Sequence, residues 1–233
     1  MKHDLKDAFV RGNRLGMTRP FSPELDHLVE GYRRFRENGW NPRVERWHQL
    51  REGQEPPVMV IACSDSRVDP AQIFDTDPGE MFVVRNVAAL VPPFETSPGY
   101  HGVSAALEFA VQVLKVRKIV VLGHGMCGGC RAALTQELEG TEPGEGGFIN
   151  DWIGLLGPVR AGVVAAHGTT GRPAERAMEQ AGVKVSLANL RTFPCVRRKE
   201  AAGELRLRGA FFAISDGILH VLDEDSGDFF EVK

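Results

Sequence analysis

Short hydrophobic runs alternate with helical periodicity through the middle of the chain. Residues 58–62, 81–85 and 118–123 form nearly continuous apolar runs of strand length, which is typical of a parallel sheet covered on both faces. Between the last two runs, residues 100–116 place apolar side chains at helical spacing. A helix that joins two parallel strands makes a right-handed crossover. The pattern predicts an α/β protein with a mainly parallel central sheet and helices on both faces.

The N-terminal part reads as helix without strands. Ser22 suits a helix N-cap and Pro23 the first helical position, and an apolar periodicity follows them for about four turns. A second helical stretch covers about residues 42–52. We therefore expect an N-terminal helical arm over about residues 20–55.

The C-terminal third changes from helix to strand. Residues 148–200 have a largely helical pattern with an interruption near residues 167–171, and about residues 203–233 alternate as strands separated by Gly-containing turns. This predicts a C-terminal strand extension. Because the chain contains no internal repeat and no low-complexity linker, residues 1–233 are expected to form a single domain.

Composition narrows the class of protein. Hydrophobic residues make up 42% of the 233 positions and charged residues 25%, so a disordered or fibrous chain is excluded. The net charge of −3 leaves no basic footprint for nucleic acid. No apolar run approaches the roughly 18 residues that cross a bilayer, and the first residues mix both charge signs. We expect a cytoplasmic protein with neither a nucleic-acid nor a membrane partner.

Two short segments with chemical side chains each follow a predicted strand. Cys63-Ser-Asp-Ser-Arg67 comes directly after one apolar run, and Gly123-His-Gly-Met-Cys-Gly-Gly-Cys130 ends another. Ligands bind at the carboxyl ends of the strands in open α/β sheets. If the two strands are neighbours, both segments meet at the same edge of the sheet.

The residue types in these segments favour zinc. A catalytic zinc takes three protein ligands and keeps a fourth position for water, and two cysteines with one histidine is a known set. His124-x-x-Cys127 offers two ligands within one turn, and Cys63 arrives from the other strand end. An isolated His-x-x-Cys is typical of an ordinary loop, and an isolated cysteine such as Cys63 is typical of a core residue. Together, at the ends of two strands, they indicate a metal site.

A dinucleotide site is the first alternative. Residues 123–128 satisfy G-x-G-x-x-G between a strand and a helix. However, His124 and Cys127 project into the space that a pyrophosphate needs, and the acidic residue expected about 20 positions later falls in a Gly/Pro-rich loop. A P-loop is excluded, because the segment does not contain the Gly-Lys-Ser/Thr that this motif requires. We therefore prefer the metal.

The two segments together closely resemble the paired signature of the β-class carbonic anhydrases, and residues 78–88, 100–109 and 186–190 also look like family segments. The resemblance covers roughly residues 20–220. It implies a carbonate dehydratase, a lyase that catalyses the zinc-dependent reversible hydration of CO₂ to bicarbonate and a proton by attack of zinc-bound hydroxide. The implied site has one Zn²⁺ per chain on Cys63, His124 and Cys127, with Asp65 and Arg67 as the catalytic dyad.

The resemblance also implies the substrate pocket and the assembly. Phe82, Val87 and Phe109 would form an apolar wall for CO₂, and Gln54 would donate an amide hydrogen to a substrate oxygen. Gln54 matches the plant-type pattern, which favours an open site in which Asp65 does not bind the metal. Phe109 departs from that pattern, because plant-type members generally have a tyrosine there. Family members assemble as homodimers or as tetramers built from dimers, with arm and sheet edge at the interface and pocket residues from both chains.

Two rival functions remain open at this stage. In a non-enzymatic zinc or bicarbonate-sensing module, Asp65 would complete a four-coordinate structural site. In a thiol redox protein, Cys127 and Cys130 would act as a Cys-x-x-Cys pair. Metal content combined with a CO₂-hydration assay separates the three classes.

Overall fold

The structure is a computed structural model and describes residues 25–233. By its contacts the chain divides into two units, Met1–Glu52 and Gly53–Lys233, which are described separately below. The expected cap at Ser22 and the proline at position 23 lie outside the described residues. No helix in the described part of the chain is both long and apolar enough to span a bilayer.

The first unit contains the expected N-terminal helical arm. Helix α1 (Asp26–Phe35) continues through a π-helical turn and a 3₁₀ turn into α2 (Val44–Leu50). Aromatic side chains hold this bent arm: the rings of Trp40 and Trp47 stack at 4.8 Å, and Phe35 meets Trp47 edge-on at 6.0 Å. The second helix begins two residues later than the sequence pattern predicts.

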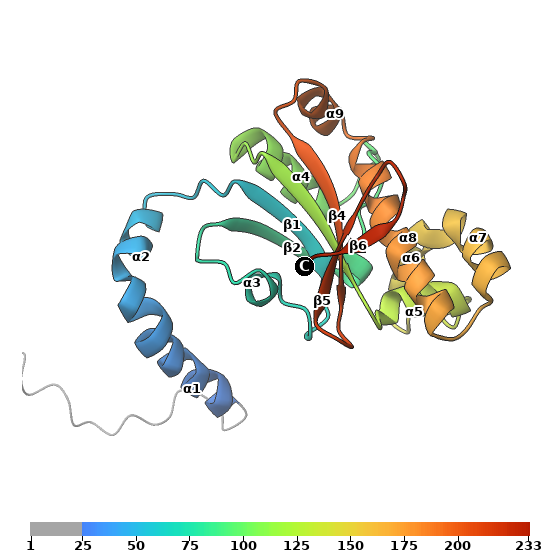
Figure 1. Cartoon of the computed structure of the whole chain (residues 1–233), viewed down its shortest axis with the longest axis horizontal. Helices are drawn as coiled ribbons and strands as arrows, with labels where there is room; N and C mark the ends of the chain where they lie inside the picture. The colour runs from blue at the N-terminus through green and yellow to red at the C-terminus, as the bar shows by residue number, and fades with distance from the viewer. Residues whose placement is uncertain (1–24) are drawn as a thin grey trace, which may run out of the picture. The chain divides into compact units, whose positions relative to one another are not determined.

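A six-stranded sheet forms the centre of the second unit, in the order β2-β1-β3-β4-β5-β6 (Figure 1). The first four strands in this order are parallel, while β5 and β6 add antiparallel strands at one edge. The predicted mainly parallel sheet and C-terminal strand extension are thereby confirmed. The strands are β1 (Val58–Cys63), β2 (Met81–Asn86), β3 (Lys118–His124), β4 (Arg206–Ala213), β5 (Ile218–Leu222) and β6 (Phe229–Glu231).

Helices lie on both faces of this sheet. On one face Met59 and Ile61 pack in a large core cluster with side chains of α8, including Val183. On the other face Val60 packs in a smaller cluster beside Ile73 of α3. The helices of this unit are α3 (Pro70–Ile73), α4 (Gly102–Glu108), α5 (Gly128–Thr135), α6 (Gly147–Ile153), α7 (Gly157–His167), α8 (Arg172–Leu190) and α9 (Pro194–Ala201). The helix predicted over residues 100–116 is shorter, because α4 passes into a π-helical turn at Phe109–Val113.

Helix α8 approaches the carboxyl end of β3 very closely. A Cβ atom built on Gly123 would lie 2.6 Å from Cγ2 of Val183, a separation that side chains do not tolerate. Glycine at this position therefore allows the helix to pack directly on the strand end. The same contact brings the N-terminal half of α8, including Glu179, beside the segment that follows β3.

Candidate metal centre

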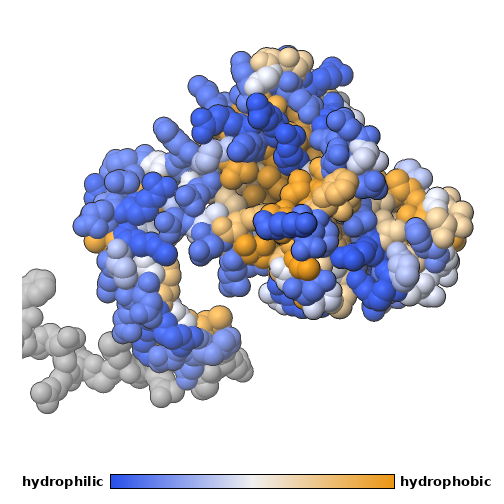
Figure 2. Space-filling view, viewed as in Figure 1, coloured by the Kyte–Doolittle hydropathy of each residue, from blue (hydrophilic) through white to orange (hydrophobic). Residues whose placement is uncertain are grey.

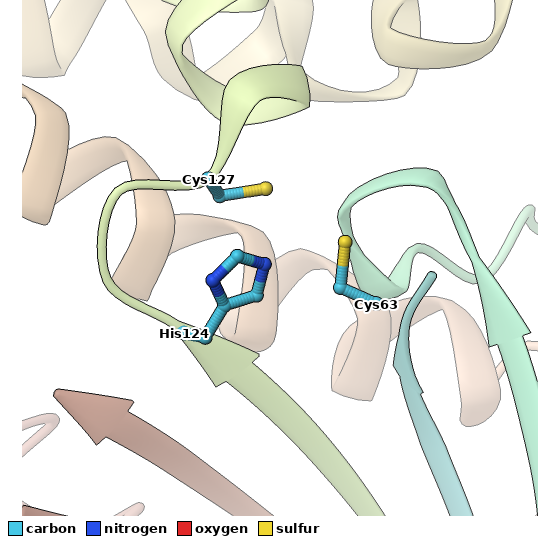
Figure 3. A group of neighbouring side chains, drawn as sticks. All are labelled: Cys63, His124 and Cys127. Carbon is cyan, nitrogen blue, oxygen red and sulfur yellow. The ribbon is translucent and has the colours of Figure 1, made fainter. Parts of the chain in front are cut away.

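Two neighbouring strand ends bring the three expected metal ligands together. Cys63 is the last residue of β1, His124 is the last residue of β3, and Cys127 is the N-cap of α5. Because β1 and β3 pair in parallel, their carboxyl ends lie at one edge of the sheet. The Sγ atoms and an imidazole nitrogen all lie within 4.8 Å of one another, and the three side chains converge in Figure 3. All three residues are at least 94% buried.

A tight turn brings His124 and Cys127 to the same side. Met126 adopts a left-handed backbone conformation with φ of 58°, which reverses the chain between the two ligands. The backbone N–H of Gly125 donates to the carbonyl of Phe212 on β4 at 2.9 Å. This bond fixes the start of the turn to the neighbouring strand.

The hydrogen bonding of His124 leaves one ring nitrogen ready for a metal. Its Nδ1 atom lies 2.9 Å from the carbonyl oxygen of Gly125, which can only accept, so we assign the proton to Nδ1. The Nε2 atom then presents a lone pair, and it is buried without a hydrogen-bond partner among residues 25–233. An orphaned buried acceptor is costly unless something binds it. A zinc ion fits this position, because metal-bound histidines typically donate their other nitrogen to a carbonyl or carboxylate.

The two thiols also fit a soft cation. The adjacent thiol of Cys127, followed by burial, raises the pKa of Cys63 to about 12, and the adjacent thiol of Cys130 raises the pKa of Cys127 to about 12. Metal binding requires the thiolate forms, and a cation among them supplies the compensating charge. The donor set of two sulfurs and one imidazole nitrogen suits tetrahedral zinc with one position left for solvent.

The predicted dyad forms a bidentate ion pair beside the ligands. Arg67 donates to Asp65 from Nε at 2.9 Å and from Nη2 at 2.7 Å, and its backbone N–H adds a third bond at 3.0 Å. These bonds hold the pKa of Asp65 well below its usual range, so the carboxylate stays ionised. Arg67 also donates to the carbonyl of Met126 at 3.0 Å. The guanidinium therefore joins the loop after β1 to the turn after β3.

Sequence reasoning missed Arg85, which organises the loop that carries the dyad. From β2, its guanidinium donates to the carbonyls of Cys63 at 2.9 Å and Asp65 at 2.6 Å, and to the carboxylate of Asp69 at 3.0 Å. Asp69 in turn caps α3 through the backbone N–H of Ala71. The sequence shows an arginine near the end of an otherwise apolar strand, which indicates that its charge has a partner. The sequence does not show which residue that partner is.

A second missed residue is Glu179 on α8. Only 3% of its surface is exposed, and its Oε1 atom accepts from the backbone N–H of Cys127 at 3.1 Å. Arg172 places a nitrogen 3.5 Å from the same oxygen, whereas Oε2 has no hydrogen-bond partner among residues 25–233. Burial raises the pKa of Glu179. No local motif marks this glutamate, because the contact joins positions 52 apart in sequence.

The expected pocket residues are placed differently from the ligands. Gln54 is exposed and precedes β1, at the opposite end of that strand from Cys63. Phe82 pairs with Met59, four positions before Cys63, which corresponds to about 13 Å along the strand. The ring of Phe109 lies 5.9 Å from that of Phe82 and is 42% exposed. The described chain does not bring these three side chains to its own metal ligands.

Val87 lies closer to the ligand segment. It follows β2 directly, and a Cβ atom built on Gly129 of α5 would meet its Cγ1 atom at 2.8 Å. Its carbonyl accepts from the indole of Trp152 at 2.8 Å. The side chain is 39% exposed, so it offers an apolar surface next to the N-terminus of the helix that begins after Cys127.

Comparison with known proteins identifies the class. The sequence model of the carbonic anhydrase family matches residues 58–219. The chain is 32% identical to β-carbonic anhydrase 3 of Arabidopsis thaliana over 202 residues, which are 86% of this chain and 78% of that protein. It is also 32% identical to the mitochondrial β-carbonic anhydrase 6 of the same plant, over 82% of this chain and 65% of that protein.

Solved structures agree with this result. The β-carbonic anhydrase CcaA superimposes with a TM-score of 0.82 at 29% identity, covering 91% of this chain and 93% of that chain. A Coccomyxa β-carbonic anhydrase in complex with acetazolamide superimposes with a TM-score of 0.76 at 29% identity, covering 90% of this chain and 93% of that chain. A tetrameric β-carbonic anhydrase of Sordaria macrospora superimposes with a TM-score of 0.74 at 28% identity, covering 86% of this chain and 98% of that chain.

This chain belongs to the carbonic anhydrase family, with the β-class enzymes as its relatives. The family that the signature segments indicated is therefore confirmed, and so are the lyase activity and the zinc cofactor. The dinucleotide alternative is wrong.

Proposed function

We propose that this chain hydrates CO₂ at a zinc ion held by Cys63, His124 and Cys127, with Asp65 and Arg67 as the catalytic dyad. The main support is that potential ligand atoms of these three buried residues lie within 4.8 Å of one another. In addition, Nε2 of His124 is buried without a hydrogen-bond partner among residues 25–233. When bound there, zinc lowers the pKa of water so that a nucleophile is available near neutral pH.

The hydrogen bonds of Asp65 support its role as an acceptor for the nucleophile. Its Oδ1 atom accepts from both the backbone N–H and Nε of Arg67, so both lone pairs are used. Among the residues that the structure describes, its Oδ2 atom accepts only from Nη2 of Arg67, which leaves one lone pair for another donor. That lone pair can accept the proton of a hydroxyl group and so aim an oxygen lone pair of the nucleophile at the carbon of CO₂.

The same ion pair supports an open site of the plant type. The group of potential ligand atoms contains Cys63, His124 and Cys127 but not the carboxylate of Asp65. With both of its oxygens bonded to Arg67, the carboxylate has a partner and does not need the metal. The rival structural-zinc module requires Asp65 to leave Arg67 and become the fourth ligand.

The test combines metal analysis with a stopped-flow CO₂-hydration assay on the purified chain. We expect one zinc per chain and rapid hydration. Zinc without hydration would support the non-enzymatic module, and neither zinc nor hydration would support the thiol redox protein. Cys195→Ser is the matched control, because this cysteine lies on α9 and packs against the large core cluster.

We also propose that the active form is a homodimer, or a tetramer built from dimers. Strand β2 is at the edge of the sheet, and its Val83 is 39% exposed on the face that carries Val60. Apolar surface gathers over the strands in Figure 2, and Val221 on the same face is 36% exposed. A second chain that covers this surface would remove it from water. One solved relative is described as tetrameric.

In such an assembly each active site can combine residues of two chains, and we call this arrangement a composite site. Gln54, Phe82 and Phe109 are remote from the metal ligands of their own chain, so we propose that they line the pocket of the partner's site. Two aromatic rings and an amide would then provide the apolar wall and the hydrogen-bond donor that CO₂ and bicarbonate need. Light scattering during size-exclusion chromatography tests the oligomer.

We propose a cytoplasmic location for the protein. All four cysteines are free thiols, and a reducing compartment keeps thiols in that form. Cell fractionation with a compartment marker is the test, and recovery of the protein with mitochondria, as the name of one relative indicates for that enzyme, would contradict the proposal.

A further inference from the structure

A second thiol lies next to a metal ligand and has no role in the proposed function. Cys127 is the N-cap of α5 and Cys130 is the third residue of that helix, so the two form Cys-x-x-Cys across its first turn. Both are free and 97% buried. This is the position in which paired cysteines exchange between dithiol and disulfide in redox proteins.

The packing around the pair favours a bond between these two sulfurs. The side chains of Cys127 and Cys130 interact directly and belong to the same core cluster. The first turn of α5 is regular, with the N–H of Arg131 donating to the carbonyl of Cys127 at 3.0 Å. The Sγ atom of Cys130 faces Gly182 of α8, where a Cβ atom would lie at van der Waals distance, 3.9 Å away, so this part of α8 presents no side chain to the sulfur.

We propose that Cys127 and Cys130 form an oxidation site, in which a hydroperoxide converts the pair to a disulfide and thereby removes Cys127 from the metal site. The inference rests on the proposed role of Cys127 as a ligand. Hydrogen peroxide is a small neutral molecule like CO₂, so a site open to CO₂ admits it. Oxidation would release zinc and stop hydration, and reduction followed by zinc would restore both.

The reaction balances with peroxide as the oxidant. The sulfur of Cys127 attacks one oxygen of hydrogen peroxide, the O–O bond breaks, and a sulfenic acid and one water form. The sulfur of Cys130 then attacks the sulfenic sulfur, its proton leaves with the hydroxyl group as a second water, and the S–S bond forms. Two thiols are oxidised by two electrons in total, and the peroxide is reduced to two waters.

Cys63 is the competing partner, because its sulfur lies within 4.8 Å of the sulfur of Cys127. Its backbone is held at the strand end: its carbonyl accepts from Arg85 at 2.9 Å, and the N–H of Ser64 donates to Asn86 at 2.8 Å. A disulfide requires Cβ atoms about 3.5–4.5 Å apart, and two cysteines in one helical turn reach this by local adjustment. A bond from Cys63 would have to draw a strand end and a helix together.

The test treats the zinc-loaded, full-length protein with hydrogen peroxide. Zinc release is followed with a chromogenic chelator, disulfides are mapped by peptide mass spectrometry, and hydration is measured before oxidation and after dithiothreitol and zinc. We expect one Cys127–Cys130 disulfide for each zinc released and full recovery of activity. Cys130→Ser should bind zinc and hydrate CO₂ normally before oxidation but fail to recover. Its oxidised Cys127 then lacks the thiol in its own helical turn, the remaining neighbour Cys63 is held at the strand end, and Cys127 proceeds to sulfinic acid.

The outcomes separate this inference from the proposed function. Cys195→Ser is the control and should behave like the unmodified chain. A Cys63–Cys127 disulfide, or reversible zinc loss in Cys130→Ser equal to that of the unmodified chain, would overturn the oxidation site while leaving the metal site intact. Failure of the untreated chain to bind zinc would instead remove the proposed function.

Discussion

The buried carboxylate of Glu179 accepts a hydrogen bond from the backbone N–H of Cys127 at 3.1 Å, which ties a metal ligand to helix α8. The bond restrains the backbone of Cys127 next to its ligand side chain. Arg172 lies 3.5 Å from the same oxygen and supplies the nearby positive charge. A buried carboxylate is costly, so its use here indicates that the position of the Cys127 backbone matters.

The first prediction concerns this bond. Glu179→Ala should weaken zinc binding by about 10–100-fold, the usual cost of losing a group that orients a ligand. Glu179→Gln should lose less, because the amide oxygen can still accept from Cys127. Competition with a chromophoric chelator measures both affinities, and the melting temperature of the metal-free protein serves as control. Equal zinc affinity in Glu179→Ala and the unmodified chain would show that the contact only supports the fold.

The second prediction concerns the ligands. Cys63→Ser, His124→Ala and Cys127→Ser should each lower zinc occupancy and abolish hydration, because three protein ligands leave no spare donor. Cys195→Ser should retain both. Metal content by mass spectrometry together with the hydration assay decides the matter, and full occupancy with activity in Cys127→Ser would rule out this metal site.

The third prediction concerns the dyad. Asp65→Asn should keep zinc but lower the turnover rate by about 10²–10⁴, the range of a positioned proton acceptor, because an amide can present hydrogens where an acceptor is needed. Arg67→Ala should also lose rate, since the carboxylate then loses the two hydrogen bonds from the guanidinium and keeps only the one from the backbone N–H. Stopped-flow hydration at matched zinc content makes the measurement. Near-native turnover of Asp65→Asn would make the carboxylate a bystander.

The fourth prediction concerns pH. The raised pKa of about 12 at Cys63 and Cys127 means that both thiols are protonated in the metal-free fold at neutral pH. Zinc must displace about two protons, so its apparent affinity should rise with pH and fall in acid. Titration calorimetry in buffers of different ionisation enthalpy counts the protons. Zinc binding without proton release would contradict thiol ligation.

The same raised pKa values determine how the stability of the metal-free protein changes with pH. A folded pKa above the ordinary value of 9.0 stabilises the fold fully at lower pH, and this contribution is lost as pH rises from about 9 toward 12. Denaturant unfolding of the metal-free chain should therefore show falling stability on the alkaline side. Binding of zinc should reverse this dependence, because the metal favours the thiolates.

Sequence patterns predicted the part of the site that is local to strand ends. Cys63 and His124 each end a strand whose apolar run is visible in the sequence, so the sequence predicts that they converge if the two strands are neighbours. Glu179 and Arg85 were missed because their contacts join elements that only the packed fold brings together. Only the resemblance places Gln54 in the pocket, because it precedes β1 and so lies at the end of that strand opposite Cys63.

The last prediction tests whether sites combine residues of two chains by mixing two variants, each of which lacks a different part of the proposed site. Cys127→Ser lacks a metal ligand but keeps Gln54, whereas Gln54→Ala keeps the ligands but lacks the amide. If Gln54 serves the partner's site, a mixed dimer contains one site with both defects and one site with neither. Random exchange makes half of the dimers mixed, so activity should return to about a quarter of the unmodified value. If Gln54 serves its own chain, every site carries a defect and mixing restores nothing. Cys127→Ser refolded alone, and then with an equal amount of Gln54→Ala, gives the comparison, with light scattering to confirm that both samples are oligomeric.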